Sequence, residues 1–170
     1  MKQTAFVTGA NGFLGVNLIR ELLENNWDVV AFHRPTSNIK YLKGLDVKLA
    51  RGNITDYPSI FQGMPDNVDA VFHTAANTQL GERHHEQQFL VNVSGTKNIL
   101  YCAKQKKAKR FIYTSSISAF GVFDHDISEE TPVNIHERGC NHYNYTTLLK
   151  KKLKRQQWRD YMLLFLTPAG

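Results

Sequence analysis

The sequence predicts a doubly wound α/β fold, in which one parallel sheet carries helices on both faces. Short apolar runs typical of buried strands alternate with segments of helical periodicity, and the connections between them are short. A glycine-rich turn follows the first apolar run and leads directly into the first helical segment. No internal repeat or low-complexity linker interrupts the alternation.

The predicted elements follow one another at regular intervals. Residues 4–8 form a first strand, and apolar residues at helical spacing predict a helix over residues 14–24. A short helix is expected to begin at Asp56, as its cap, and to reach Met64. For residues 163–166 two interpretations remain open, a strand and a plain hydrophobic edge. The remaining predictions are strands at residues 29–32, 47–50, 70–73 and 111–114, and a long helix at 89–104.

Size and composition favour one globular domain. The chain has 170 residues, 42% of them hydrophobic and 21% charged, which suffices for one sizeable core. It contains no apolar run long enough to span a membrane. Cys102 and Cys140 lack the spacing of a metal or redox site, which favours a reduced, cytoplasmic protein.

Much of the net charge of +6 lies in two basic runs, residues 104–110 and 150–155. The first run falls at the predicted end of a helix, where cations suit the negative end of the helix dipole. No aromatic interleaving or recognition motif accompanies the charge. We therefore expect no nucleic-acid partner.

Gly9, Gly12 and Gly15 lie between the first strand and the first helix. In this position the chain must turn tightly, let a pyrophosphate approach its backbone and seat the helix closely on the sheet. The amides at the start of the helix then face the phosphates. The turn, which includes Phe13 and Leu14, therefore predicts a dinucleotide site of the Rossmann type.

The residues after the second strand bear on the choice of dinucleotide. A carboxylate at this position accepts hydrogen bonds from the ribose hydroxyls of NAD, whereas an arginine can bind the 2′-phosphate of NADP. This chain has His33 and Arg34, followed by Ser37, and no acid. The sequence therefore predicts NADP(H), held by Arg34 and Ser37. The alternatives are NAD as cofactor and an Arg34 that is simply solvated.

Residues 7–15 and 34–38 resemble the extended short-chain dehydrogenase/reductase family, which includes the NAD-dependent epimerase/dehydratases. They are most similar to its dihydroflavonol-reductase-like branch. The resemblance covers residues 4–145 and implies an NAD(P)-dependent oxidoreductase or epimerase/dehydratase. Its substrate would be a carbonyl or alcohol of a small molecule or a sugar nucleotide. Relatives often pair through two helices beside the active site, which implies a homodimer.

Three further segments, residues 52–56, 73–76 and 92–96, resemble family motifs around the adenine, the ribose and the active site. The first has an acid that contacts adenine in the family, and this chain has Asn53 there, which keeps a hydrogen-bonding group without the charge. The positions that the resemblance assigns to the cofactor in these segments are Asn53, Ile54, Ala75, Ala76 and Asn92.

The resemblance also implies two catalytic residues. Residues 113–121 resemble the strand end that supplies a catalytic hydroxyl. Counting back from Phe120 and Gly121, where the family has Tyr-Gly, assigns this role to Ser116, which would hydrogen-bond the reacting oxygen. Tyr143 is the candidate for the family's proton donor, which also contacts the cofactor.

The lysine that accompanies this tyrosine in the family is absent. It normally lies four residues later on the same helical face, where its ammonium lowers the pKa of the phenol. This chain has Thr147 there, and Lys150 would lie roughly 10 Å from Tyr143 along a helix axis. We therefore expect a dinucleotide-binding domain, residues 1–146, followed by an atypical tail, residues 147–170, that lacks the family's substrate region.

A shift of reading frame explains such a tail. Residues 148–151 can be encoded by the codons TTG-CTG-AAA-AAG. If the base before them is C and the frame starts at that base, the same bases read CTT-GCT-GAA-AAA, which encodes Leu-Ala-Glu-Lys. That resembles the family's continuation after its lysine. The same shift can turn Thr167-Pro168 into the Asn-Pro that ends the family's next strand. The alternative is a genuine short protein with a lysine-rich helix.

Three functions follow from these observations. The leading hypothesis is a truncated and inactive member of the oxidoreductase family. The second is a non-catalytic module that binds NADP(H) and regulates a partner. The weakest is a metal hydrolase built on His73, His84, His85 and His125, because adjacent histidines point in different directions and no Asp or Glu set completes a site.

Overall fold

The computed structural model describes residues 2–79, 85–116, 128 and 161–166. Six strands form one sheet in the order β3-β2-β1-β4-β5-β6, and every neighbouring pair is parallel. This confirms the predicted doubly wound fold. The strands are β1 (Thr4–Thr8), β2 (Asp28–His33), β3 (Lys48–Arg51), β4 (Ala70–His73), β5 (Arg110–Ser116) and β6 (Tyr161–Leu166).

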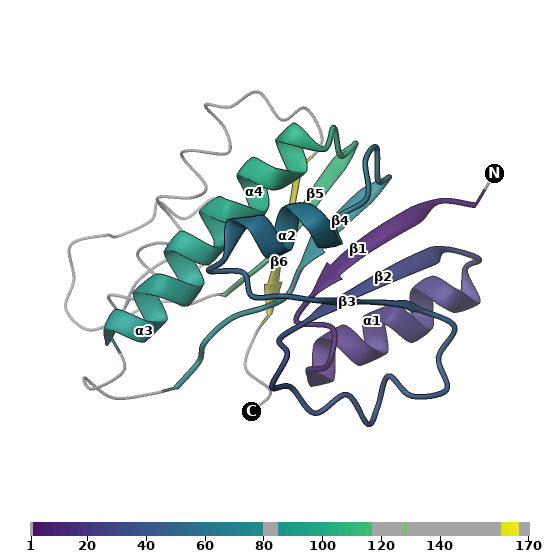
Figure 1. The fold of residues 1–170 in the computed structure, drawn as a ribbon, viewed down its shortest axis with the longest axis horizontal. Helices are drawn as coiled ribbons and strands as arrows, with labels where there is room; N and C mark the ends of the chain where they lie inside the picture. The colour runs from purple at the N-terminus through teal and green to yellow at the C-terminus, as the bar shows by residue number, and fades with distance from the viewer. Residues whose placement is uncertain (1, 80–84, 117–127, 129–160, 167–170) are drawn as a thin grey trace.

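Helices lie on both faces of the sheet (Figure 1). On one face lies α1 (Phe13–Glu24); on the other lie α2 (Tyr57–Gly63) and a long helix in three parts. The parts are α3 (His85–Phe89), the π-helical segment η2 (Leu90–Gly95) and α4 (Thr96–Gln105). Among the described residues, no helix has the length and apolar character needed to cross a membrane.

Two hydrophobic cores separate the sheet from these helices. Alternate residues of a strand point to opposite faces, so β2 sends Val29 and Ala31 into the core beneath α1. Val30 and Phe32 enter the core beneath α2 and α4. Because both faces are covered, the strands read as continuous apolar runs in the sequence, which is why they were predictable.

Two details differ from the sequence-based expectation, and a third decides between two open interpretations. The helix expected at residues 89–104 begins at His85, ends at Gln105 and contains the π-helical turn. Asp56 occupies the N-cap position of α2, but its side chain makes no capping hydrogen bond. The Ser59 hydroxyl instead donates to the Asp56 carbonyl oxygen at 2.8 Å. Residues 161–166, for which two interpretations were open, form a strand paired with β5.

The strand order reverses between β1 and β4, because β2 and β3 extend the sheet to one side of β1 and β4 to β6 extend it to the other. After β1 the chain turns to the face of the sheet that carries α1, and after β4 it turns to the opposite face, which carries the long helix. In an open α/β sheet, this switch point leaves a crevice at the carboxyl ends of the strands, where ligands bind.

Candidate functional site

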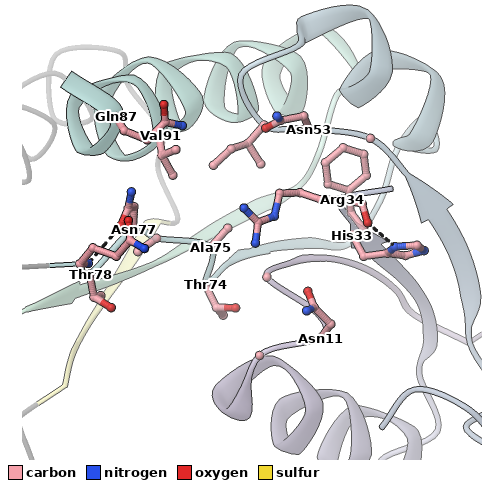
Figure 2. A pocket seen from close by; sticks show the side chains of 17 residues that line it. Asn11, His33, Arg34, Asn53, Thr74, Ala75, Asn77, Thr78, Gln87 and Val91 are labelled. Carbon is pink, nitrogen blue, oxygen red and sulfur yellow. Dashed lines mark hydrogen bonds between the residues drawn. The ribbon is translucent and has the colours of Figure 1, made fainter. Parts of the chain in front are cut away.

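A cleft of about 480 Å³ lies at the switch point (Figure 2). The register pairs Thr8 with Phe32 on one side and with His73 on the other, so β1, β2 and β4 end side by side. The loops after β1 to β4, together with α3 and η2, supply the lining. It consists of Gly9, Asn11, Gly12, Phe32, His33, Arg34, Gly52, Asn53, Ile54, Thr74, Ala75, Ala76, Asn77, Thr78, Gln79, Gln87 and Val91.

The turn between β1 and α1 forms the floor of the cleft. Gly9 has a φ of +66°, and a β-carbon there would lie 2.8 Å from both the Ala75 nitrogen and the Thr74 hydroxyl. A β-carbon on Gly15 would overlap the Gly9 carbonyl oxygen and lie 2.9 Å from Ala10 Cα. Both positions therefore require glycine, since the obstacles are largely backbone atoms.

The first turn of α1 is open to an anion. Gly12 is the N-cap residue, no side chain caps the helix, and no acidic residue lies in the first turn. The free amides and the positive end of the helix dipole therefore face the cleft beside Gly9 and Gly12. This arrangement suits the pyrophosphate of a dinucleotide.

Arg34, immediately after β2, brings a positive charge to one side of the cleft. Its side chain is exposed, and its guanidinium extends over the cleft toward Ala75 (Figure 2). No carboxylate is among the described lining residues, and Arg34 makes no ion pair within the described part of the chain. The guanidinium is thus free to bind an anionic ligand.

The backbone of Arg34 is fixed by its neighbours. Its carbonyl oxygen accepts a hydrogen bond from His33 Nδ1 at 3.0 Å and from the Ser37 amide at 3.0 Å. His33 Nε2 and the Ser37 hydroxyl are both buried without a hydrogen-bond partner among the described residues. Ser37 does not line the cleft, although it follows the arginine in the same turn.

The loop after β3 forms the far end of the cleft. Asn53 Oδ1 accepts the Thr55 amide at 3.1 Å, and the Asn53 amide donates to the Ser59 hydroxyl at 3.0 Å. Ile54 is buried against Gly95, where an added β-carbon would lie 2.7 Å from Ile54 Cγ1. This loop and η2 are therefore in close contact beside the cleft.

The segment after β4 forms the opposite wall. The Thr74 hydroxyl donates to the Thr8 carbonyl oxygen at 2.7 Å. Asn77 and Asn92 are joined by two hydrogen bonds: the Asn77 amide donates to Asn92 Oδ1 at 2.7 Å, and Asn92 Nδ2 donates to the Asn77 carbonyl oxygen at 2.9 Å. Asn92 thus holds the wall from behind and does not itself line the cleft.

The structure brings together seven of the residues predicted to bind the cofactor: Gly9, Gly12, Arg34, Asn53, Ile54, Ala75 and Ala76. Gly15 is buried beneath the turn, Leu14 is partly exposed, and Phe13 is 89% exposed at the start of α1. Sequence reasoning missed Asn11, Thr74, Asn77 and Gln87. Of these, Asn11 lies within the glycine turn and was the most accessible to prediction, since it is flanked by Gly9 and Gly12.

The two predicted catalytic residues are placed differently. Ser116 is the last residue of β5, and the pairing of His73 with Tyr113 shows that β5 continues three residues past the end of β4. Its backbone therefore lies at the same edge of the sheet as the cleft. Tyr143 and Thr147 lie outside the described residues, as does most of the predicted tail.

The metal-site hypothesis finds no support in the described part of the chain. His73 is buried, and both of its ring nitrogens lie close to threonine hydroxyls. Burial lowers the pKa of His73 from 6.5 to about 3. No group of three or more His, Cys, Asp or Glu side chains with metal-binding geometry occurs among the described residues. His84 and His125 lie outside them, and of His85 only the backbone, at the start of α3, is described.

The chain is similar in sequence to several curated proteins. A Synechocystis protein named as a candidate dihydroflavonol 4-reductase is 38% identical over 122 residues, which cover 72% of this chain and 35% of the relative. Sterol demethylase protein B from Methylococcus capsulatus is 37% identical over 127 residues, covering 75% and 38% of the two chains. This chain therefore spans little more than a third of the length of these curated relatives.

A solved structure shares the fold. The Bordetella bronchiseptica enzyme WbmH, determined in complex with NAD+, superposes with a TM-score of 0.82 over 98% of this chain and 57% of its own, at 23% identity. The sequence model of the NAD dependent epimerase/dehydratase family matches residues 5–167. The chain belongs to the NAD dependent epimerase/dehydratase family.

Proposed function

We propose that this chain is the NADP(H)-binding part of an oxidoreductase of this family. The observation that carries the proposal is the charge of the cleft: Arg34 extends over it, and the described lining contains no carboxylate. A carboxylate at the end of β2 would select the ribose hydroxyls of NAD, whereas a guanidinium favours a 2′-phosphate. Two solved structures of this fold were determined with NAD+ or NAD, so the proposed preference for NADP(H) rests on Arg34 and on the absence of a carboxylate from the described lining.

The remaining lining fits the rest of the dinucleotide. The pyrophosphate would lie on the Gly9–Gly12 turn and the free amides of α1, and the adenine against Asn53 and Ile54. Ala75 and Ala76 have small side chains that let a ribose approach the backbone. When bound, the nicotinamide would exchange hydride with a carbonyl or alcohol carbon of a small molecule or sugar nucleotide. We assign the hydrogen bonds to the substrate oxygen to Ser116 and Tyr143, and we expect a cytoplasmic homodimer.

Calorimetric titration of the 170-residue chain with NADPH and NADH tests the choice of cofactor. A charge-assisted hydrogen bond contributes about 1.5–3 kcal/mol, so Arg34→Gln should weaken NADPH binding on the order of 10- to 150-fold and leave NADH binding nearly unchanged. Arg20→Gln, which removes an exposed charge from α1, is the matched control and should change neither affinity. Equal affinity of the unmodified chain for the two cofactors would refute the proposal.

One sequence feature favours a second function, a dinucleotide-binding module without catalysis. Thr147 stands four residues after Tyr143, where the family has the lysine that lowers the pKa of its catalytic tyrosine. Under this alternative, the chain binds NADPH with normal affinity and shows no turnover with any carbonyl substrate. Because the leading hypothesis also expects no turnover from this chain, the coding DNA separates the two functions. A long alternative frame with a helix–strand pattern downstream of codon 147 favours a truncated oxidoreductase, and its absence favours the module.

A further inference from the structure

A buried hydrogen-bonded chain passes behind the cleft through His73. This side chain is 1% exposed, and its ring packs against the Tyr113 ring at a tilt of 34°, with centroids 5.6 Å apart. Nδ1 lies 2.6 Å from the Thr8 hydroxyl at the end of β1, and Nε2 lies 2.9 Å from the Thr96 hydroxyl at the start of α4. The ring therefore bridges the central strand and the helix that covers it.

The partners determine which ring nitrogen carries the proton. The Thr96 hydroxyl donates its single hydrogen to the Asn92 carbonyl oxygen at 2.7 Å, because a carbonyl can only accept. Thr96 must then accept from His73, so Nε2 carries the hydrogen. Burial keeps the ring neutral by lowering its pKa to about 3. Nδ1 consequently carries no hydrogen and accepts a hydrogen bond from the Thr8 hydroxyl.

This series of hydrogen bonds connects the glycine turn, which would carry the pyrophosphate, with the Ala75–Asn77 wall, which would carry the ribose. Thr8 immediately precedes Gly9, and its hydroxyl accepts the Ala75 amide at 3.4 Å. At the other end, Asn92 holds Asn77 through two hydrogen bonds. All donations run in one direction, from the Ala75 amide through Thr8, His73 and Thr96 to Asn92, which is the arrangement in which neighbouring hydrogen bonds strengthen one another.

We propose that His73, as the neutral Nε2–H tautomer, is a positioning residue that sets the spacing between the glycine turn and the Ala75–Asn77 wall. It does not line the cleft, so it would act on ligand binding only through Thr8 and Thr96. The consequence for dinucleotide affinity rests on the proposed function. The tautomer, and its effect on the glycine turn and the Ala75–Asn77 wall, do not depend on the proposed function.

The test begins without a ligand. At about pH 5, where an ordinary imidazole is charged, a long-range ¹H–¹⁵N spectrum of the histidine-labelled, 170-residue chain should show a neutral imidazole with its proton on Nε2. Its loss in His73→Phe assigns it to His73. Thr96→Val keeps the ring and removes the acceptor, so it should change this ring's resonances and shift the Asn77 amide. A charged ring, a proton on Nδ1, or no response to Thr96→Val would overturn the assignment.

NADPH titrations then test the positioning role. His73→Phe preserves a planar ring and removes both nitrogens, and it should weaken binding about tenfold while moving the amide resonances of Gly9, Gly12 and Asn77 together. His73→Asn restores an acceptor near the Nδ1 position and should recover affinity to within about threefold. The control, Val71→Ala, creates a cavity on the same strand without touching the chain of hydrogen bonds, and it should leave affinity unchanged.

The outcomes separate the two proposals. Unchanged affinity in His73→Phe, or an equal loss in Val71→Ala, would overturn the positioning role. If the unmodified chain fails to bind NADPH, the proposed function is wrong, and the tautomer and amide shifts alone decide the role of His73. If His73→Phe does not fold, Thr96→Val provides the same affinity and amide measurements.

Discussion

At the scale of single residues, close backbone approaches define the site more than polar contacts do. Gly9 and Gly15 bring the turn, the wall after β4 and the start of α1 within distances at which no β-carbon fits. The helix consequently begins directly at the floor of the cleft, with its amides free. Sequence analysis identified these glycines because a strand, a turn and a helix surround them in the required order.

Gly15→Ala should destabilise the fold and abolish dinucleotide binding. The added methyl group would meet backbone atoms of Gly9 and Ala10, which cannot rotate away as a side chain can. Because several backbone atoms would have to move, we expect a loss of more than about 3 kcal/mol in the free energy of unfolding, measured by urea denaturation. Gly44→Ala is the control: it has a φ of +86° with open space around it, so it should cost only about 1 kcal/mol. Comparable losses in the two variants would contradict this account.

The role of His73 was beyond sequence analysis. The sequence suggested two interpretations for this residue, a metal ligand and part of a ribose-lining motif. Its partners Thr8 and Thr96 lie 65 and 23 residues away, and nothing in their local sequence marks them as a pair. Only the parallel register of β1 and β4, with α4 packed on them, brings the three together.

At the scale of elements, the apolar strands were predictable and the details of the long helix were not. Strands expected at residues 29–32 and 47–50 are found at Asp28–His33 and Lys48–Arg51. The π-helical turn η2 within the long helix has no signature in apolar periodicity, because it adds only one residue to a turn. It nevertheless carries Asn92, which holds the wall of the cleft, and Gly95, which contacts Ile54.

Asp69 connects three strands at the edge opposite the cleft. Its carboxylate accepts hydrogen bonds from Lys109 Nζ at 2.6 Å and from the Thr4 amide at 2.8 Å, next to the starts of β5 and β1. The hydrogen bond from Lys109 is the main cause of a lowered pKa for this carboxyl group, and the Thr4 amide adds to it. The carboxylate therefore stabilises the folded state only while it is ionised.

Asp69→Asn should make the stability less sensitive to acid. Because the pKa is lowered on folding, the contribution of Asp69 is present above its unfolded pKa of about 3.9 and is lost as the pH falls through the folded value. We expect the variant to lose about 1 kcal/mol at pH 7 and progressively less below pH 4, as measured by urea unfolding. Asp46→Asn, at an exposed carboxylate without an ion pair in the described part of the chain, is the control. A constant difference between Asp69→Asn and the unmodified chain at every pH would exclude this mechanism.

At the scale of the whole molecule, the strand order determines where chemistry can occur. The reversal between β1 and β4 places the glycine turn, Arg34 and the Ala75–Asn77 wall around one cleft, although they are distant in the sequence. β5 and β6 extend the sheet beyond that cleft, with Ser116 paired to Leu166 at their ends. The sequence predicted the first five strands and a doubly wound sheet, but the strand order, with β6 at one edge, comes from the structure.

The origin of residues 147–170 stays a prediction. We propose a shifted reading frame from about codon 147, because one such event would replace the expected lysine and introduce the basic run. Sequencing the coding DNA tests this directly. The proposal fails if the alternative frames downstream of codon 147 contain no long open stretch with a helix–strand pattern. The strand β6 at Tyr161–Leu166 is the part of this segment that the structure describes.

The absence of a lysine at position 147 leads to a prediction about catalysis by the whole chain. A phenol becomes an effective acid or base near neutral pH when a cation lowers its pKa, and Thr147 offers none to Tyr143. General acid–base catalysis contributes about 10²–10⁴-fold to a rate, so we expect oxidation of NADPH by small carbonyl compounds to stay at the buffer background. The absorbance of the reduced nicotinamide measures this, on a preparation already shown by calorimetry to bind NADPH. The control is Tyr143→Phe, because a residual rate that remains in this variant does not come from the proposed proton donor.

Robust turnover by the unmodified chain that disappears in Tyr143→Phe would show that Tyr143 works without the lysine. The inactive state proposed for this chain would then be wrong.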